Sequence, residues 1–451
     1  MPSLRLTAIN LTAGLLAWAL TPTISLAQED SAAALPLPLN EVRMFTEALE
    51  SIRRAYVEEI DDRTLLEYAI KGMLSGLDPH SAYMAADDYD VLMESTSGEF
   101  GGLGIEVGRE DSFIRVIAPI DNTPADRAGI RAGDLIIAID NKPLRELLPE
   151  EAANMMRGEP GTDVTVTISR EGTEPFDLTI TREIISVASV RSRMLEPGFA
   201  YLRISQFRVD TGNEFVEEID KLYSEHGDLK GIVLDLRNNP GGVLQSSVAV
   251  VDAFIDAGQI VYTQGRMEGN DLDFSATINT SAPDVPLVVL INNGSASASE
   301  IVAGALQDHG RAIVMGTRSF GKGSVQTVLP LDERRAIKLT TSRYYTPGGR
   351  SIQAQGIEPD IEVGDAFVTR RSRRALQFSE SDLQGHLENE EVGTEIVDSD
   401  AAMSEALISA EEVLVTDYPL NEALNVLKGI NAFRPQASGA SSGNFAQRLG
   451  D

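Results

Sequence analysis

The chain has 451 residues, of which 42% are hydrophobic, which is enough for two or three packed cores. Its 38 Lys+Arg against 69 Asp+Glu give a net charge of −31. This argues against a general nucleic-acid binder and against adhesion to an anionic membrane, since both need a basic face. With no cysteine, disulfides, thiolate metal sites and a cysteine nucleophile are excluded. The four histidines have no i, i+4 pair, so we expect no metal site: His80, His226, His309, His386.

Residues 1–27 have the pattern of a secretory signal peptide. A basic residue, Arg5, precedes a ten-residue apolar run, 11–20, and the small-x-small sequence Ser25-Leu-Ala27. We therefore expect an exported, periplasmic protein. The alternative is an uncleaved segment that keeps the protein at the membrane, although the run is short for a span.

The remaining chain changes pattern several times, which predicts an α/β multidomain protein. Residues 28–96 are mainly helical in periodicity, and 97–184 are short alternating strands and turns after a Gly-rich opening. In 185–365, apolar strands alternate with helices, which is typical of an α/β core with partly parallel strands. Residues 366–451 form an acidic linker, a helical segment at 401–430 and a Ser/Gly-rich tail that we expect to be disordered.

A near match to a phosphate-binding loop fails on inspection. The segment Gly316-Thr-Arg-Ser-Phe-Gly-Lys322 follows an expected strand at 311–316. The next residue should be Ser or Thr and should open a helix, but it is Gly323, and 325–331 alternate as a strand does. Lys322 therefore needs another role.

Three serines, which alternate with alanines, lie at the junction of an expected strand (286–292) and an expected helix (297–308). A serine at such a junction is exposed, and the unpaired N–H groups of the helix start can stabilise an oxyanion. The alternative is that the serines only cap and pack: Ser295, Ser297, Ser299.

A hydroxyl nucleophile needs a base. His309 lies at the far end of the same expected helix and is badly placed, whereas a buried lysine with a lowered pKa can replace histidine. If Lys322 begins a strand, alternation puts Gln326 on its face, where it could hold the amine. The alternative is a solvated loop lysine.

A second Gly-rich turn, 236–242, joins an expected strand (231–236) to an expected helix (243–257). Its two glycines allow backbone N–H groups to approach a ligand, although an ordinary strand-to-helix turn has the same residues.

Together these segments resemble the carboxyl-terminal processing peptidases, or tail-specific proteases. The resemblance covers about residues 41–365 and rests on five stretches: Gly231-Ile-Val-Leu-Asp-Leu-Arg-Asn-Asn-Pro-Gly-Gly242, Asn293-Gly-Ser-Ala-Ser-Ala-Ser-Glu-Ile301, Gly321-Lys-Gly-Ser-Val-Gln326, Tyr344-Tyr-Thr-Pro-Gly-Gly349 and Ile352-Gln-Ala-Gln-Gly-Ile-Glu-Pro-Asp360. It implies a protease core with crotonase-like βαβ elements and a Ser/Lys dyad, without metal or cofactor.

The resemblance also implies the roles of individual residues. In the family the lysine follows the serine by 25 positions, which makes Ser297 the nucleophile and Lys322 the general base. It further implies that Gln326 orients the lysine and that the N–H groups of Gly242 and Ala298 form the oxyanion hole.

Residues 97–184 resemble a PDZ domain, in the loop 101–107 and in the stretch 122–140. In such domains consecutive loop N–H groups capture a terminal carboxylate while the peptide adds to a strand. The resemblance assigns substrate binding to five residues: Gly101, Gly102, Leu103, Gly104, Ile105.

The sequence thus predicts a serine endopeptidase that engages exported proteins by unstructured carboxyl-terminal tails, with the PDZ domain binding the tail and gating activity. The alternative is a catalytically latent PDZ tail-binding protein that needs a partner. By analogy with relatives, the helical regions 28–96 and 401–430 suggest a homo-oligomer or a helical-repeat adaptor, and no nucleic-acid partner is expected.

Overall fold

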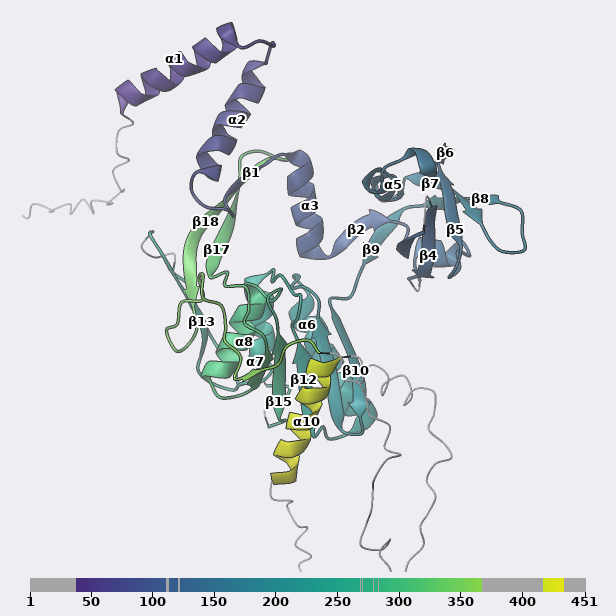
Figure 1. Ribbon diagram of the computed structural model, residues 1–451, viewed down its shortest axis with the longest axis vertical. Coiled ribbons are helices and arrows are strands. Elements are labelled where there is room, and N and C mark those ends of the chain that lie inside the picture. Colours follow the sequence, from purple (N-terminus) through teal and green to yellow (C-terminus); the bar gives the residue numbers. More distant parts are fainter. Residues whose placement is uncertain are drawn as a thin grey trace, which may run out of the picture. The chain divides into compact units, whose positions relative to one another are not determined.

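The computed structural model describes residues 38–366 and 417–433, apart from 111, 112, 121, 268, 270, 279 and 283 (Figure 1). The expected signal peptide, 1–27, and the expected linker and tail lie outside the described residues. The chain forms two compact units, Met1–Ala69 and Ile70–Asp451.

The first unit contains helix α1 (Leu39–Ala55) and the start of α2 (Asp62–Ser75). No residue of α1 is buried, and its apolar side chains include exposed Met44 and Phe45. None of the helices in the described residues is both long and apolar enough to cross a bilayer.

The second unit opens with the remainder of α2, a short strand and a helix: β1 (Ala82–Met84) and α3 (Ala86–Ser97). Three helices, α1, α2 and α3, lie in the described part of the region 28–96 that was expected to be helical, whereas β1 was not expected. Its three residues are too few to show a period, and only pairing with a distant strand, β18 (Ala336–Tyr345), makes them a strand.

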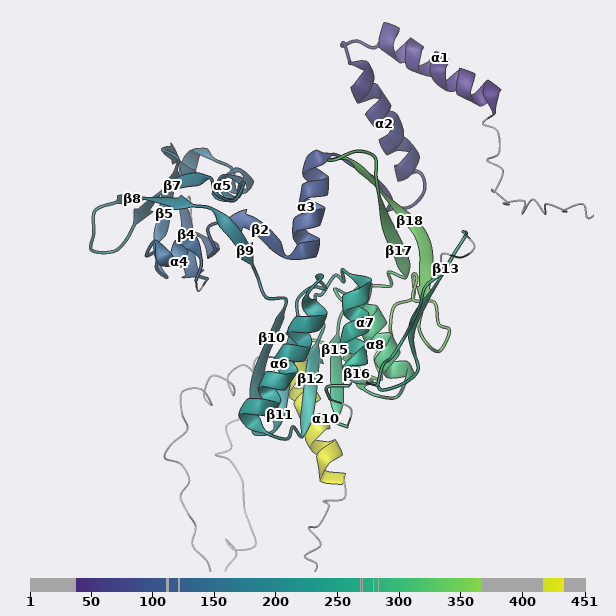
Figure 2. The same cartoon turned by 180° about the vertical axis from the view of Figure 1, so that it is seen from behind.

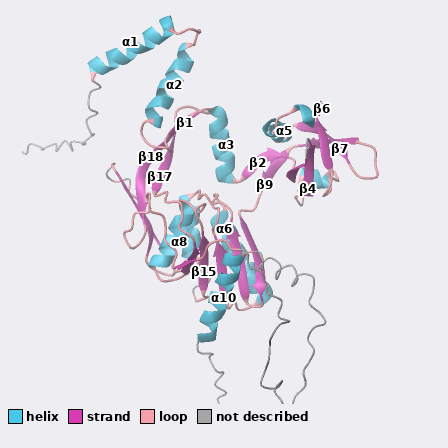
Figure 3. Ribbon diagram, viewed as in Figure 1, coloured by secondary structure: helices cyan, strands magenta, loops and turns pink. Residues whose placement is uncertain are grey.

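A β-rich domain follows, in which one-sided burial produces alternation. Strand β7 (Asp163–Ser169) alternates between buried and more exposed residues, and Val164, Val166 and Ile168 face the core. Its antiparallel sheet has the order β3-β4-β5-β7-β8, with β6 beside β5, and β2 pairs with β9 as a separate ribbon (Figure 3). The elements are β2 (Glu99–Gly102), β3 (Ile105–Glu110), β4 (Phe113–Pro119), α4 (Pro124–Arg127), β5 (Leu135–Ile139), β6 (Lys142–Pro143), η1 (Leu144–Glu146), α5 (Pro149–Met156), β8 (Phe176–Thr181) and β9 (Glu183–Ser186).

The α/β core is built on a six-stranded sheet of order β10-β11-β12-β15-β16-β19, parallel except for β10. Strands β12 and β15 are buried throughout because helices cover both faces (Figures 1 and 2). Its elements are β10 (Val190–Glu196), β11 (Phe199–Ile204), α6 (Thr211–His226), β12 (Gly231–Asp235), α7 (Leu244–Asp252), β15 (Leu287–Ile291), α8 (Ala298–Asp308), β16 (Ile313–Gly316), β19 (Ile361–Glu362) and α10 (Tyr418–Phe433).

The side chains of the central strands divide between two cores. Ile232 and Leu234 face the core that includes residues of α6, α7 and α8, whereas Val233 faces α10. A second sheet joins β1, β18, β13 (Gln259–Gly265) and β14 (Asp273–Ser275), with β17 (Ser324–Pro330) paired to β18. The predicted α/β multidomain class is confirmed, and the carboxyl ends of β12 and β15 lead into the two expected turns.

Candidate active site

Ser297 is the residue before helix α8, and its backbone is strained, with φ 56° and ψ −112°. A non-glycine residue pays a conformational penalty there, and such strain is found at functional sites. The hydroxyl groups of the other two candidate serines donate to backbone carbonyls. That of fully buried Ser295 donates to the Leu236 carbonyl (2.8 Å), and that of Ser299 donates to the Asn239 carbonyl (3.0 Å). Of the three candidate serines, only Ser297 is partly exposed.

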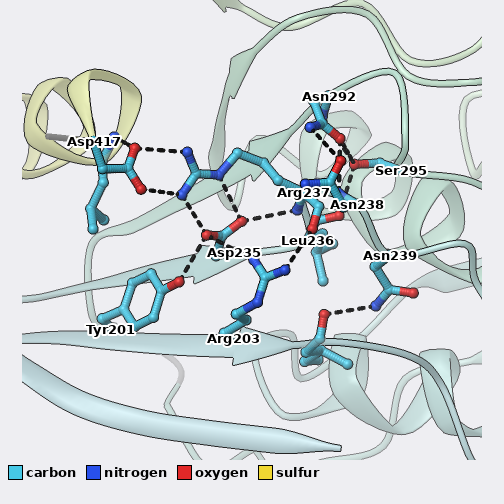
Figure 4. Close-up of polar contacts among 12 residues, drawn as sticks. Tyr201, Arg203, Asp235, Leu236, Arg237, Asn238, Asn239, Asn292, Ser295 and Asp417 are labelled. Atoms are coloured by element: carbon cyan, nitrogen blue, oxygen red, sulfur yellow. Dashed lines mark hydrogen bonds and ion pairs between the residues drawn. The ribbon is translucent and has the colours of Figure 1, made fainter. Parts of the chain in front are cut away.

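Side-chain hydrogen bonds connect the turn that follows β12 with the turn that follows β15 (Figure 4). The Asn292 amide donates to the Asn238 side chain (3.0 Å) and accepts from the Asn238 N–H (2.9 Å). Buried Asn239 donates to the Ile204 carbonyl (2.9 Å) and accepts from the Gly241 N–H (2.9 Å). The turns therefore behave as one rigid unit around Ser297.

Gly241 and Gly242 are required by this close approach. A Cβ added to Gly241 would lie 2.7 Å from the Cβ of Ser297, and one added to Gly242 would lie 1.9 Å from the Phe207 carbonyl oxygen. Within the described residues, neither the Gly242 N–H nor the Ala298 N–H has a hydrogen-bond acceptor. Two free N–H groups beside a strained serine are the arrangement that an oxyanion hole needs.

Lys322 lies on the loop before β17, half-buried. Burial lowers the pKa of Lys322, Lys338 lowers it further, and Glu300 opposes the shift. The Tyr344 hydroxyl donates to the Lys322 carbonyl oxygen. Burial raises the pKa of Tyr344 far above its ordinary value, and a hydrogen bond with the Ser297 side chain opposes that shift. Tyr344 therefore contacts the Ser297 side chain and the Lys322 backbone, and the described contacts include no direct hydrogen bond between the Ser297 and Lys322 side chains.

A residue without an assigned role in the sequence analysis joins the two dyad candidates. Glu300 is fully buried, and one carboxylate oxygen accepts from the N–H groups of Ser297 (2.7 Å) and Lys322 (2.9 Å). The other accepts from the Ser319 hydroxyl (2.5 Å) and the Gly321 N–H (2.6 Å). Burial raises the pKa of Glu300, and these four hydrogen bonds favour its ionised form. The Ser-x-x-Glu spacing, a capping signal, could have identified it.

Gln326 has a different partner from the one expected. Its amide donates to the carbonyl (3.2 Å) and the hydroxyl (2.9 Å) of Ser324. Strand β17 begins at Ser324, so Lys322 precedes it and the alternation argument does not reach the lysine. A hydrogen bond from Lys322 to Gln326 stays a prediction.

A turn before β1 also reaches this site. The Asp78 carboxylate accepts from the His80 N–H (2.8 Å) and the Ser81 hydroxyl (2.6 Å), and Ser81 accepts from the N–H of Thr340 (3.1 Å). Thr340 is the cross-strand partner of Gln326. Burial lowers the pKa of His80, as does the charge of Lys322. In the sequence this histidine was considered only in the argument against a metal site.

The predicted carboxylate-binding segment lies at the entrance of the β-rich domain. Gly101 and Gly102 belong to β2, and Ile105 opens β3, an edge strand of its sheet. The described residues provide no acceptor for the N–H groups of Leu103 and Gly104.

Beside β3 lies a cavity of about 230 Å³. It is lined by Val107, Gly108, Phe113 and Ile114 and, across the groove, by residues of η1, α5 and the segment between them. Free N–H groups, an open strand edge and an apolar cavity are the three parts of a site for a peptide carboxyl terminus.

Three family descriptions match the chain. "Peptidase family S41" matches residues 198–363, "PDZ domain" matches 115–170, and "Activating protease CtpB N-terminal domain" matches 20–88. No three His, Cys, Asp or Glu side chains of the described residues gather as metal ligands would.

Curated relatives and solved structures are also similar to this chain. A carboxy-terminal-processing protease of Bartonella bacilliformis is 45% identical over 392 residues, covering 86% of this chain and 88% of the relative. The carboxy-terminal processing protease CtpA of Bacillus subtilis is 35% identical, covering 70% and 67%. The structure of a photosystem II D1 C-terminal processing protease is 30% identical, covers 72% of this chain and 93% of its own, and has a TM-score of 0.43.

Proposed function

The chain belongs to peptidase family S41 as a serine-type carboxy-terminal processing peptidase, and from this premise we propose that Ser297 and Lys322 are its catalytic dyad. The observation that carries the proposal is the Glu300 carboxylate, which holds the backbone N–H groups of both residues on one oxygen. It fixes a strained serine and a half-buried lysine against each other.

The chemistry follows from these positions. Neutral Lys322 takes the hydroxyl proton of Ser297 as its oxygen bonds to the peptide carbonyl carbon. The N–H groups of Gly242 and Ala298 stabilise the oxyanion, and the lysine returns the proton to the leaving amine. Water, deprotonated by the same lysine, then releases the acyl group. Lys322 can act as this base because burial lowers its pKa.

We assign substrate selection to the PDZ domain. The free N–H groups of Leu103 and Gly104 would bind the terminal carboxylate of a tail, and the tail backbone would pair with the edge strand β3. Its last side chain would enter the cavity beside Val107. An unstructured tail suits this mode because only an extended chain can add to a strand.

The setting and the assembly of the protein are part of the proposal. The pattern of residues 1–27 supports export to the periplasm, where the substrates would be exported proteins. The exposed apolar side chains of α1 and the match to an activating protease's N-terminal domain support contact with a second copy or a helical adaptor.

The test is cleavage of a soluble protein with an appended unstructured apolar tail. Ser297→Ala and Lys322→Ala should each abolish cleavage and leave thermal unfolding unchanged, whereas Lys142→Ala, an exposed lysine of the PDZ domain, should cleave normally. Residual activity of either dyad variant near that of the unmodified chain would reject the assignment.

A second candidate, a latent protein that binds tails and waits for a partner, is favoured by one observation. The Gln326 amide nitrogen donates to Ser324, and the described contacts include no hydrogen bond between Gln326 and the lysine. A fluorophosphonate probe separates the two states: rapid labelling of Ser297 in the isolated chain supports the active form, and labelling only after a tailed substrate is added supports latency.

A further inference from the structure

Helix α10 forms one wall of the α/β core although about fifty residues separate it from β19. Its side chains Leu420, Ala423, Leu424 and Leu427 are at most 1% exposed. They pack with residues of β12, β15 and β16 on the sheet face opposite α6, α7 and α8 (Figures 1 and 2). The described part of the expected helical segment 401–430 therefore covers the chain's own core.

The start of this helix carries an ion pair to the oxyanion turn (Figure 4). Asp417 accepts from both terminal nitrogens of Arg237, at 2.8 and 2.7 Å. The other edge of that guanidinium binds Asp235 at 3.0 and 2.6 Å. Asp235 is completely buried and also accepts from the Tyr201 hydroxyl (2.8 Å) and contacts Arg203 (3.3 Å). Two carboxylates thus balance two guanidinium groups.

The pair is largely shielded from water, so the attraction between its charges is only weakly screened. The Arg237 side chain is 14% exposed and that of Asp417 26%. Burial would raise the pKa of Asp417, but hydrogen bonds and charge from Arg237 outweigh it and lower the pKa. Without Asp417, the guanidinium would lose half its acceptors and leave an unbalanced positive charge in the cluster.

Arg237 is also the residue at which the catalytic turn leaves β12. Asn238 follows with φ 56° and binds Asn292 of the serine turn, and Gly242, the proposed oxyanion donor, comes five residues after Arg237. The Arg237 N–H itself donates to Asp235 (2.9 Å). The guanidinium thus fixes the direction in which the turn departs from the sheet.

We propose that Asp417 is a positioning residue for catalysis, through which helix α10 holds the Arg237 turn and, with it, the oxyanion-binding N–H of Gly242. The inference rests on the proposed assignment of Gly242 and Ser297. It makes the helix beyond residue 416 a working part of the peptidase site, in addition to a cover for the core.

The experiment measures kcat and KM of the full chain for a tailed substrate, and the rate of Ser297 labelling by a fluorophosphonate. Asp417→Asn should lower kcat and the labelling rate about tenfold to a hundredfold, since a displaced oxyanion donor acts on the transition state, with KM changed less than about threefold. Asp417→Glu, which retains the charge but displaces the carboxylate by one methylene, should lower kcat only severalfold, less than Asp417→Asn does. Glu422→Gln, the same charge change elsewhere on α10, should match the unmodified chain.

The outcomes separate the inference from the proposed function. Equal kcat for Asp417→Asn and Glu422→Gln, or a change in KM alone, overturns the inference, while Ser297→Ala still tests the dyad by itself. Thermal unfolding and circular dichroism identify loss of fold. If Asp417→Asn does not fold, Asp417→Glu decides, because its carboxylate is displaced by one methylene: a kcat reduced severalfold at constant KM supports positioning, and an unchanged kcat rejects it.

Discussion

The catalytic turns and the PDZ groove hold their polar groups in opposite ways. Around Ser297, the buried side chains of Asn239 and Glu300 bind backbone groups of the surrounding segments. Along β3 the strand edge is open, and the N–H groups of Leu103 and Gly104 have no acceptor among the described residues. In the first region a network of buried side chains surrounds two unpaired N–H groups, those of Gly242 and Ala298, whereas in the second the unpaired N–H groups lie beside an open strand edge.

This difference fits the role that we propose for each region. Transition-state stabilisation needs donors that do not reorganise, so the catalytic turns are held rigid by buried side chains. Peptide capture needs unpaired backbone and an empty cavity, which a saturated network could not provide. Substitutions should therefore affect kcat in the first region and KM in the second.

The largest effect should come from Glu300→Gln. The substituted amide can accept at only one of its two positions, so its NH2 group would face either the N–H groups of Ser297 and Lys322 or the Ser319 hydroxyl together with the Gly321 N–H. Each unpaired buried N–H costs about 1–3 kcal/mol, so we expect kcat to fall at least about a hundredfold and the melting temperature to decrease. Glu362→Gln, on an exposed glutamate of the same domain, is the matched control. Normal kcat in Glu300→Gln would show that the carboxylate does not position the dyad.

An intermediate effect should come from filling the PDZ cavity. Ala153 of α5 lines it, and Ala153→Phe would occupy the space proposed for the last side chain of the tail. Loss of that burial, about 1.5–3 kcal/mol, should raise KM about tenfold to a hundredfold without lowering kcat at saturation. Asn154→Phe, at an exposed neighbour on the same helix, should leave KM unchanged. Equal KM values for the two variants would show that the last side chain of the tail does not bind in this cavity.

The smallest effect should be a shift in pH dependence. The base must be neutral, so the rate rises as pH rises through the pKa of Lys322, which burial and Lys338 lower below the ordinary value of about 10.4. Lys338→Met removes one lowering charge. The pKa of Lys322 should therefore rise, and the acidic limb of the kcat/KM profile should move to higher pH. The other ionisable groups near Lys322, Glu300 and His80, are present in both proteins. A limb that moves to lower pH, or that moves equally in Lys142→Met, would contradict this assignment.

Much of the fold could be predicted from local pattern. The apolar runs became the buried strands β12 and β15, and the serine turn leads into α8 at Ala298. The rejected phosphate loop is indeed followed by a strand, β17, rather than a helix. These features depend on neighbouring residues, which a single sequence reveals directly.

The missed features depend on residues far apart in the chain. Strand β1 exists only through its pairing with β18, and Asp417 reaches Arg237 across 180 positions. For Gln326 the alternation argument assumed that Lys322 begins the strand, whereas β17 begins at Ser324, so its contact with the lysine stays a prediction. Single-sequence periodicity carries no information on such partners.

The strained backbone of Ser297 has a consequence for the evolution of this protein. A glycine would adopt its φ of 56° without penalty, and would thereby make the fold more robust, but it has no hydroxyl. Substitution of Ser297 by glycine would therefore increase the stability of the fold and remove the proposed nucleophile. Selection for stability alone would favour the inactive glycine variant. A serine at so unfavourable a conformation fits a position whose hydroxyl is needed for chemistry.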